Sequence, residues 1–389
     1  MCARDLRFSQ RGEALIGQTM FTVLDEARRL EADGSHIYHL ELGNPRLPPP
    51  ATIVSRTIES LRALDVGYTQ SGGHPALREA VARRYSDIYN HPIGPDNVVV
   101  SPANLIINQF LDIMCDRGGR VVFFTPAFPT YWAAALHSGI EVLSVPLDPA
   151  SGYDLSQDAV TRALALNPCA IIVNSANNPT GAVYDREPLE RLARECEARG
   201  IWLLSDETYG EISFGKPFYS LGPLDLPHVV IMSSFSKILS VPGFRIGYLI
   251  AHPAVAGKFA LSVSTLLSCL PIFTQMGCAM ALETLSDYTD LVKRRCIEIT
   301  DWCSAQLART NRIGFTAPAA GFYFFLDVSS SGMDDVAFSH LLLEEERTAV
   351  TPGSSFGDRY TSHIRVATCG APGDVREGIR RIISLVDRL

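Results

Sequence analysis

The chain lacks the features that mark membrane proteins and nucleic-acid-binding proteins. It has no uninterrupted apolar stretch of about 18 residues, which a membrane-spanning helix would need. Its formal net charge is -8, from 34 Lys and Arg against 42 Asp and Glu. Because general nucleic-acid binding requires an excess of basic residues, this balance argues against it.

The sequence also has no cysteine framework and no leader-like segment. Its nine cysteines are scattered singly, without a CxxC or a His-rich spacing, so they indicate neither structural disulfides nor a metal site. Met1 to Glu13 form a polar, charged segment rather than a signal peptide. We therefore expect a soluble, cytoplasmic protein that binds no metal, nucleic acid or membrane.

Short apolar runs alternate with helix-sized segments through the first two thirds of the chain. The predicted strands are Asn97–Val100, Val121–Phe124, Val142–Val145, Ala170–Val173, Ile201–Leu204, Val229–Met232 and Ile246–Ile250. Several are apolar throughout, which is typical of strands buried on both faces. The pattern predicts an α/β fold with a mainly parallel seven-stranded sheet covered by helices.

The C-terminal third has a different pattern. Helices are predicted over 288–307, 334–346 and 374–389, and strands over 322–328 and 364–367. Near the N-terminus a helix is predicted over 21–31, and Pro45 to Pro50 form a connection. We expect a large domain over residues 50–285 and a smaller α+β domain built from residues 1–49 and 286–389.

Polar side chains follow five of the predicted strands. They include Ser101, the Phe128 region, the segment from Asn174 to Gly181, Asp206 with Tyr209, and Lys237. Ligands of open α/β sheets bind at the carboxyl ends of the strands, so these residues are expected to share one site. Taken singly, each also fits a structural role: Asp206 as a helix N-cap, Asn178 to Gly181 as a turn, and Phe128 as core.

Lys237 lies in the most informative segment. The run reads Ser234-Phe235-Ser236-Lys237, and Arg245 follows in Gly243-Phe244-Arg245. A lysine amine can form a Schiff base with an aldehyde, while hydroxyls and a guanidinium can hold a phosphate dianion. These residue types together indicate a site for an aldehyde cofactor that carries a phosphate.

These motifs, in this order, resemble the class I/II aminotransferases, which are pyridoxal 5′-phosphate (PLP) enzymes of fold type I. The resemblance covers nearly the whole chain. Its further motifs are Gly43-Asn44-Pro45, Tyr68, Gly73, Leu77-Arg78, Asn178-Pro179-Thr180-Gly181, Asp206-x-x-Tyr209, Gly321-Phe322-Tyr323, Pro352 to Gly357 and Ile364-Arg365. It implies transfer of an α-amino group from an amino acid to a 2-oxo acid, through aldimine, quinonoid and ketimine intermediates.

The resemblance also implies a role for each site residue. Lys237 would carry the cofactor and move the substrate proton, and Asp206 would pair with the ring nitrogen. The other cofactor contacts would come from Tyr209, Asn178, Phe128, Ser234, Ser236, Arg245, Ala103 and Asn104, and from Tyr68 of a second subunit in a homodimer. Arg365, Gly43 and Asn178 would contact the substrate. Ile16, Met20 and Phe21 would add an apolar lining.

One segment departs from the family pattern. Where the family has a glycine and a small residue, this chain has Ser101-Pro102-Ala103-Asn104. A helix N-terminus here can still bind phosphate through its amides. The departure keeps an alternative open, namely a PLP-dependent lyase, cyclase, replacement enzyme or oxidase acting on a specialised amino-acid-like substrate. A non-catalytic, cofactor-binding regulator is a third reading, which the acidic composition and the retained catalytic motifs disfavour.

Overall fold

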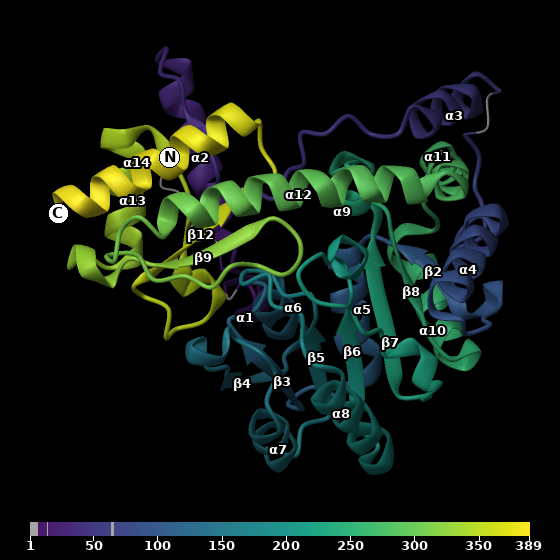
Figure 1. Ribbon diagram of the computed structural model, residues 1–389. Coiled ribbons are helices and arrows are strands. Elements are labelled where there is room, and N and C mark those ends of the chain that lie inside the picture. Colours follow the sequence, from purple (N-terminus) through teal and green to yellow (C-terminus); the bar gives the residue numbers. More distant parts are fainter. Residues whose placement is uncertain (1–6, 14, 64–65) are drawn as a thin grey trace.

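The computed structural model describes residues 7–13, 15–63 and 66–389. The first six residues of the polar N-terminal segment and Cys2 therefore lie outside the described part. A seven-stranded sheet with helices on both faces forms one part of the molecule, and a smaller α+β part lies beside it (Figure 1). The predicted α/β fold class is confirmed.

The large sheet contains the seven strands that the apolar runs predict. Their bounds are β2 Val98–Ser101, β3 Arg120–Thr125, β4 Glu141–Pro146, β5 Ala170–Asn174, β6 Trp202–Asp206, β7 Val229–Ser234 and β8 Gly247–Ile250. They lie in the order β2-β8-β7-β6-β5-β3-β4. β8 runs antiparallel to both neighbours and the other pairs are parallel. The carboxyl ends of β2, β3, β5, β6 and β7, which the predicted site residues follow, consequently lie at one edge of the sheet.

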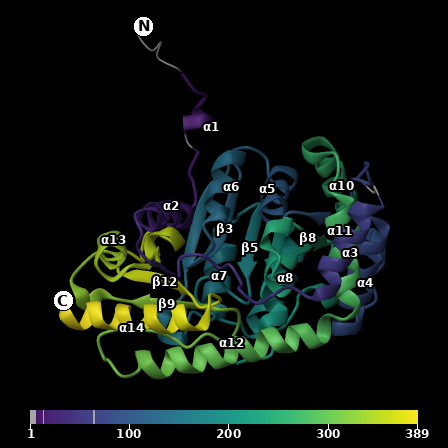
Figure 2. The same ribbon diagram turned by 90° about the horizontal axis from the view of Figure 1, so that it is seen from above.

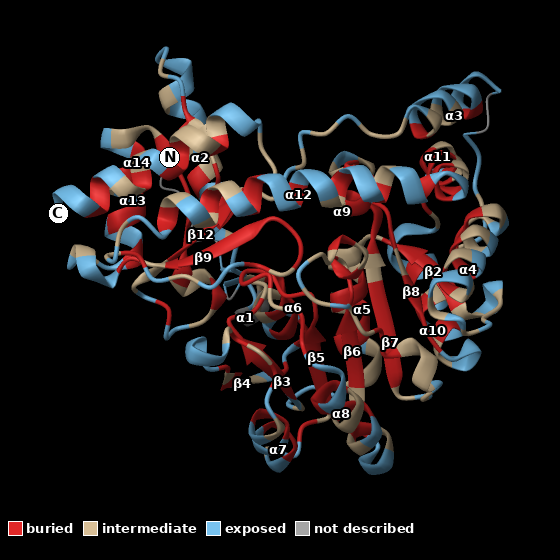
Figure 3. Ribbon diagram, in the orientation of Figure 1, coloured by how far each residue is buried: buried red, intermediate tan, exposed pale blue. Residues whose placement is uncertain are grey.

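Helices cover both faces of this sheet, and its strands are therefore mostly buried (Figure 3). The helix bounds are α1 Gln10–Glu13, α2 Thr19–Ala32, α3 Ala51–Arg62, α4 Pro75–Tyr89, α5 Ala103–Met114, α6 Thr130–Ser138, α7 Gln157–Ala165, α8 Arg186–Arg199, α9 Phe235–Ile238, α10 Pro253–Leu267, α11 Ile272–Glu283, α12 Leu285–Leu307, α13 Asp335–Glu346 and α14 Pro372–Arg388. Seen from above, α5 and α6 lie on one side of the sheet and α8 on the other (Figure 2). All five residues of β5 are buried, as its apolar sequence requires.

The long helix α12 runs along the molecule from the sheet to the smaller part (Figure 1). There β9 Tyr323–Asp327 and β12 His363–Ala367 pair antiparallel, and β11 Thr351–Pro352 joins β12. A two-stranded pair of β1 Tyr38–His39 with β10 Thr348–Ala349 connects the N-terminal segment to this part. A separate buried core packs α12, α13 and α14 against β9 and β12.

Predicted helix ends differ from the observed ends by a few residues. α14 begins at Pro372 rather than Asp374, because proline fits the first turn, where an amide donor is not needed. Among the described residues, the helices include none that combines the length and the apolar character needed to span a bilayer.

Candidate active site

A cavity of about 560 Å³ opens at the edge of the sheet where the polar strand ends meet. All residues predicted to contact the cofactor or the substrate, except Tyr68, line it, namely Gly43, Ala103, Asn104, Phe128, Asn178, Asp206, Tyr209, Ser234, Ser236, Lys237, Arg245 and Arg365. Ser101 does not reach the cavity, because its hydroxyl is buried and donates to Gln109 Oε1 at 3.1 Å.

The register of three parallel strands brings the central residues together. Asn174 at the end of β5 pairs with Asp206 at the end of β6, and Asp206 pairs with Met232 of β7. β7 then passes into the short helix α9, which carries Lys237. Polar residues that follow β5, β6 and β7 therefore line one cavity, whereas Ser101 at the end of β2 does not line it.

Lys237 projects into the cavity with its amine held by the backbone. Nζ donates to the carbonyl oxygen of Gly43 at 2.5 Å. The pKa of the amine is lowered to about 8, mainly because the amine is buried; Cys369 opposes this shift, and the positive charges of Arg365 and Arg245 contribute smaller decreases. A large fraction of this lysine is therefore neutral near pH 8, as a nucleophilic amine must be.

Gly43 is a glycine because the cavity wall approaches its backbone closely. A β-carbon at this position would lie 1.8 Å from the hydroxyl oxygen of Tyr323. That hydroxyl also shares a hydrogen bond with the hydroxyl of Tyr209 at 3.0 Å. The glycine thus lets the carbonyl that receives Lys237 pass directly beside two tyrosines.

Asp206 is buried and has no ion-pair partner among the residues that the structure describes. The hydroxyl of Tyr131 donates to Oδ2 at 2.7 Å, and the amide of Thr208 donates to Oδ1 at 3.1 Å. Burial raises the pKa of the carboxyl, although both hydrogen bonds act in the opposite direction. No α-helix begins here, so the alternative role of Asp206 as a helix cap is wrong.

Tyr131 is the functional neighbour that the sequence prediction missed. It is fully buried on α6, three residues after Phe128, and its ring meets the Phe128 ring edge-on with centroids 5.8 Å apart. The segment that leads into α6 therefore supplies an aromatic wall, and the first turn of α6 supplies the donor to Asp206. The spacing of two aromatics at i and i+3 after a strand end was the available signal.

Arg365 is almost completely buried, at 1% exposure, in the middle of β12. Its guanidinium donates to Asn178 Oδ1 at 3.3 Å, to Thr351 Oγ1 at 3.1 Å and to the backbone oxygen of Glu41. These acceptors are neutral oxygen atoms, and Nε has no acceptor among the residues that the structure describes. The group is positioned but its charge is not neutralised.

Two aromatic rings lie close to this guanidinium. Its central carbon lies 4.6 Å from the ring centroid of Tyr323 and 5.1 Å from that of Phe356. Among the described residues, no carboxylate lies within ion-pair distance of Arg365, which is costly for a buried charge unless a ligand provides one. The geometry is suited to a planar anion such as a carboxylate.

The N-terminus of α5 forms another part of the cavity wall. Pro102 caps this helix, and its carbonyl accepts from Leu105 and Ile106. The amides of Ala103 and Asn104 lie before these bonds and line the cavity. The unusual Ser-Pro-Ala-Asn segment therefore preserves a helix N-terminus, which attracts anions through its free amides and its dipole.

Two serines and a second arginine also line the cavity. Ser234 Oγ accepts from the amide of Ser236 at 3.2 Å, which orients both serines toward the cavity lining. Arg245 is exposed, adopts a left-handed φ of 55°, and donates to the Pro242 oxygen at 2.9 Å. The residues that carry these two amides, two hydroxyls and one guanidinium thus all line the cavity, in which Asp206 is the only carboxylate among the described lining residues.

Asn174 joins the two sides of the site. Its Oδ1 accepts from the Asn178 amide at 2.8 Å, and its Nδ2 donates to the Asp206 backbone oxygen at 2.9 Å. This clamp fixes the loop on which Asn178 lies, so the Asn-Pro-Thr-Gly segment is both a turn and part of the cavity wall. The sequence placed Asn174 at a strand end but did not assign it this role.

The N-terminal segment closes another wall, with one exception to the prediction. Met20 and Phe21 line the cavity, whereas Ile16 is 54% exposed and lies outside it. Gln18, which was not predicted, also lines it and donates to Thr130 Oγ1 at 3.0 Å. Tyr68 is 89% exposed and does not line the cavity of its own subunit.

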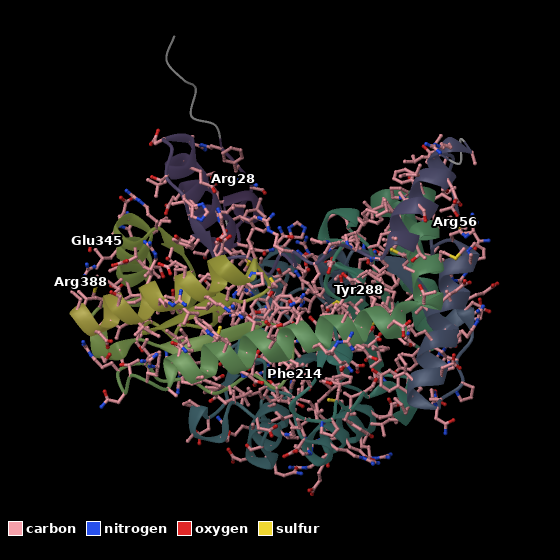
Figure 4. The ribbon with its side chains drawn as sticks, turned by 45° about the horizontal axis from the view of Figure 1, so that its top comes forward. Arg28, Arg56, Phe214, Tyr288, Glu345 and Arg388 are labelled. Atoms are coloured by element: carbon pink, nitrogen blue, oxygen red, sulfur yellow. The ribbon has the colours of Figure 1, made fainter. Side chains whose placement is uncertain are left out.

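The helix α12 supports the Lys237 turn from outside. Tyr288, labelled in Figure 4, donates to Ser240 Oγ at 2.8 Å and contacts the Pro48 oxygen at 2.9 Å. Ser240 follows Lys237 by three residues and has a φ of 54°. The phenol therefore fixes both the lysine turn and the proline-rich connection to one helix.

Comparison with known proteins agrees with this arrangement. Residues 35–382 match the family model described as aminotransferase class I and II. The aspartate aminotransferase of Thermotoga maritima is 32% identical over 340 residues, covering 85% of this chain and 87% of the relative. Its crystal structure superposes with a TM-score of 0.90 and 29% identity, over 98% of this chain and all of the other. The valine–pyruvate aminotransferase of Mycobacterium tuberculosis is 28% identical over 380 residues, covering 94% and 96% of the two chains.

Proposed function

Because this chain belongs to the class I and II aminotransferase family, we propose that the cavity around Lys237 is its active site. The protein is a PLP-dependent aminotransferase, which moves the α-amino group of an amino acid to a 2-oxo acid. The observation that carries the site assignment is the cavity itself, whose walls include Lys237 and the buried Asp206 and Arg365, neither of which has an ion-pair partner in the described part of the chain.

The residues present fit the phosphate of PLP. The Ala103 and Asn104 amides, the Ser234 and Ser236 hydroxyls and the Arg245 guanidinium are all donors that belong to residues lining the cavity. A phosphate dianion accepts hydrogen bonds from such donors. Pro102 removes no amide that this arrangement needs.

The ring would lie against Phe128, with its nitrogen toward Asp206 and its oxygen toward Tyr209 and Asn178. The Asp206 carboxylate is buried without a cation, so a protonated ring nitrogen would supply the missing partner. When bound, PLP supplies an electron sink for the electron pair left at the substrate Cα. The donor Tyr131 keeps the carboxylate facing this position.

Lys237 would attach the cofactor and afterwards act as the base that moves the Cα proton. Both tasks require a neutral amine, and burial lowers its pKa to about 8. The Gly43 carbonyl, 2.5 Å from Nζ, holds the released amine at the cavity wall, where it stays within reach of the substrate.

Arg365 would bind the α-carboxylate of either substrate. Its charge is buried and lacks a carboxylate partner in the described protein, and its hydrogen bonds to Asn178, Thr351 and Glu41 hold the fork in place. Carboxylate binding fixes the Cα–H bond relative to Lys237. Amino acids and 2-oxo acids share this carboxylate, so one arginine serves both halves of the reaction.

We infer that the preferred amino donor has an uncharged side chain. Within one subunit, the described lining contains two arginines, and Arg245 and Arg365 already serve the phosphate and the α-carboxylate. The remaining wall near α2 and α5 is formed by Met20, Phe21 and Ile107. An apolar wall favours an apolar side chain, whereas a second carboxylate would lie without a cation.

A spectral screen of the purified holoenzyme tests this function. Alanine, valine, leucine, phenylalanine and aspartate are supplied singly, without a 2-oxo acid, and the pyridoxamine phosphate formed is measured. Stoichiometric formation supports amino-group transfer, whereas regeneration of the starting spectrum with product release would instead indicate a lyase or cyclase. A higher kcat/KM for aspartate than for every uncharged donor would contradict the proposed substrate class.

We further propose that the active form is a homodimer in the cytoplasm. Val54, Ile58 and Leu61 on α3 and Leu261 on α10 are exposed apolar side chains at the end of the molecule where α3 and α10 lie (Figure 2). Such a surface is typical of a protein interface. Tyr68 follows α3 and is free to reach a partner's phosphate region.

Subunit complementation tests the dimer. In a mixed dimer, one subunit carries Lys237→Ala and the other carries Tyr68→Ala. The second subunit keeps its own Lys237 and receives Tyr68 from the first, so one of the two sites is complete. Mixing two such variants after dissociation would restore about one quarter of the wild-type sites by random pairing. No recovery above the separate variants, together with an active monomer in light scattering, would exclude a shared site.

The domain division is also a proposal. Residues 50–285 would form the large PLP-binding domain, and residues 1–49 with 286–389 the small one. The separate buried core that extends from Ile299 to Val386 and includes Leu40 supports this division.

A further inference from the structure

Two half-buried cysteines lie side by side at the edge of the sheet opposite the active site. Cys115 directly follows the last residue of α5, and Cys169 directly precedes the first residue of β5. The turn at Gly119 brings them together, since a β-carbon on that glycine would lie 3.0 Å from Cys169 Sγ and 3.8 Å from Cys115 Cβ. The contact joins two elements that are 54 positions apart in the sequence.

The two thiols interact directly. A side-chain hydrogen bond connects Cys115 with Cys169, and in its neutral form Cys169 also donates to the Arg120 oxygen at 3.0 Å. The bond from Cys115 lowers the pKa of Cys169 to about 7, while the pKa of Cys115 is raised by the same contact. One thiol is therefore available as a thiolate and the other keeps the proton.

The other described cysteines do not combine a neighbouring thiol with partial exposure to solvent. Burial raises the pKa of Cys196, Cys278, Cys296, Cys303 and Cys369. Cys269 is half-buried, and its thiol accepts from the Thr69 amide rather than from a second cysteine. Cys269 is consequently a matched control for a half-buried thiol.

We propose that Cys115 and Cys169 form an oxidisable dithiol, which a hydroperoxide converts reversibly into a disulfide between the end of α5 and the start of β5. The Cys169 thiolate attacks one peroxide oxygen, which breaks the O–O bond and gives a sulfenic acid and hydroxide; the hydroxide takes up a proton. The Cys115 thiol then attacks that sulfur, forms the S–S bond and releases water. In total, two thiols and one hydrogen peroxide give one disulfide and two waters.

The position of the pair predicts the consequence of oxidation. The disulfide would close a chain segment that contains β3, α6, β4 and α7, and such a cross-link restricts the unfolded chain. The phosphate-binding end of α5 and the Asn174 end of β5 lie at the far ends of the same elements. We therefore expect a higher melting temperature and unchanged transamination, independent of the proposed roles of the active-site residues.

The experiment treats the holoenzyme with a small excess of hydrogen peroxide, blocks free thiols and maps the peptides without reduction. The expected result is a peptide pair linked through Cys115 and Cys169, a loss of two titratable thiols, and reversal by dithiothreitol. Its rate of formation should rise as the pH increases through 7. Cys269→Ser should behave as the wild type, whereas Cys115→Ser and Cys169→Ser should form no such link.

Two results would overturn the proposal. The first is that Cys115 and Cys169 remain open to alkylation after peroxide treatment that oxidises Cys269. The second is that Cys169 proceeds to a sulfinic acid in the wild type without forming the link. If either serine variant folds poorly, the wild-type peptide map and its reversal by dithiothreitol decide the question alone.

Discussion

Replacing Arg365 with methionine removes the proposed carboxylate site while keeping an unbranched apolar chain. Losing one partner of a buried, hydrogen-bonded charge pair costs about 2–5 kcal/mol. At 1.36 kcal/mol per factor of ten, kcat/KM for an amino acid should fall by about 30- to 5,000-fold. Arg365→Lys keeps the charge but cannot form the bidentate pair, so its loss should be smaller.

The assay compares each amino acid with the amine that carries the same side chain and lacks the carboxylate. For wild-type protein the amino acid should react far faster in the first half of the reaction. In Arg365→Met the two rates should approach one another, because the arginine no longer distinguishes them. This ratio reports carboxylate binding and is insensitive to the amount of folded protein.

A matched control separates binding from folding. Arg84 is a partly buried arginine outside the cavity, where it pairs with Glu211. Arg84→Met should lower the melting temperature and leave kcat/KM within about twofold, as expected for a distant, independent site. If Arg365→Met retained kcat/KM within threefold of wild type for every amino acid tested, the assignment of the α-carboxylate to Arg365 would be wrong.

Three further predictions concern the other walls of the cavity. Asp206→Asn removes the buried charge that is proposed to face the ring nitrogen, so kcat should fall by about 10³-fold or more. Single-turnover kinetics measure this loss, and a loss below tenfold would contradict the role of Asp206. The rate at which the apoenzyme takes up PLP should rise about tenfold per pH unit below pH 8 and level off above it, because the lowered pKa of Lys237 means that only the neutral fraction reacts. A rate independent of pH between 6 and 8 in stopped-flow absorbance would refute it. Gly43→Ala should lower the melting temperature and raise KM, because its β-carbon would collide with the hydroxyl of Tyr323. Adding Tyr323→Phe to Gly43→Ala should partly restore the melting temperature and KM. If Gly43→Ala and wild type had equal KM, the reasoning would be wrong, because Tyr323 would then have moved aside without affecting substrate binding.

The strands and their common edge could be predicted because apolar runs bury on both faces and parallel strands direct their ends one way. The runs that end near Val173, Leu204 and Met232 all became neighbouring parallel strands. Helix α8 ends at Arg199 because the next residue, Gly200, adopts a left-handed conformation. Individual roles required the family resemblance, since a strand end shows where a side chain lies and not which atom it meets.

Contacts between distant segments could not be read from local patterns. Tyr131 reaches Asp206 across 75 positions, and Arg365 reaches Glu41 across 324. The pairing of Cys115 with Cys169 likewise depends on how a glycine turn places one helix end beside one strand start. Such contacts follow from strand order and packing, which local propensity does not determine.

The distribution of charge in this cavity is suited to the proposed ligands. Asp206 and Arg365 carry opposite charges, and both are buried; had they met, each would have satisfied the other and the site would hold no ligand. Separate scaffolds keep them apart. Tyr131 and Thr208 hold the carboxylate on the sheet side, while Thr351 and the neighbouring rings hold the guanidinium on β12. Neutral hydrogen bonds orient these charges without cancelling them, so a bound cation and a bound carboxylate gain the full interaction.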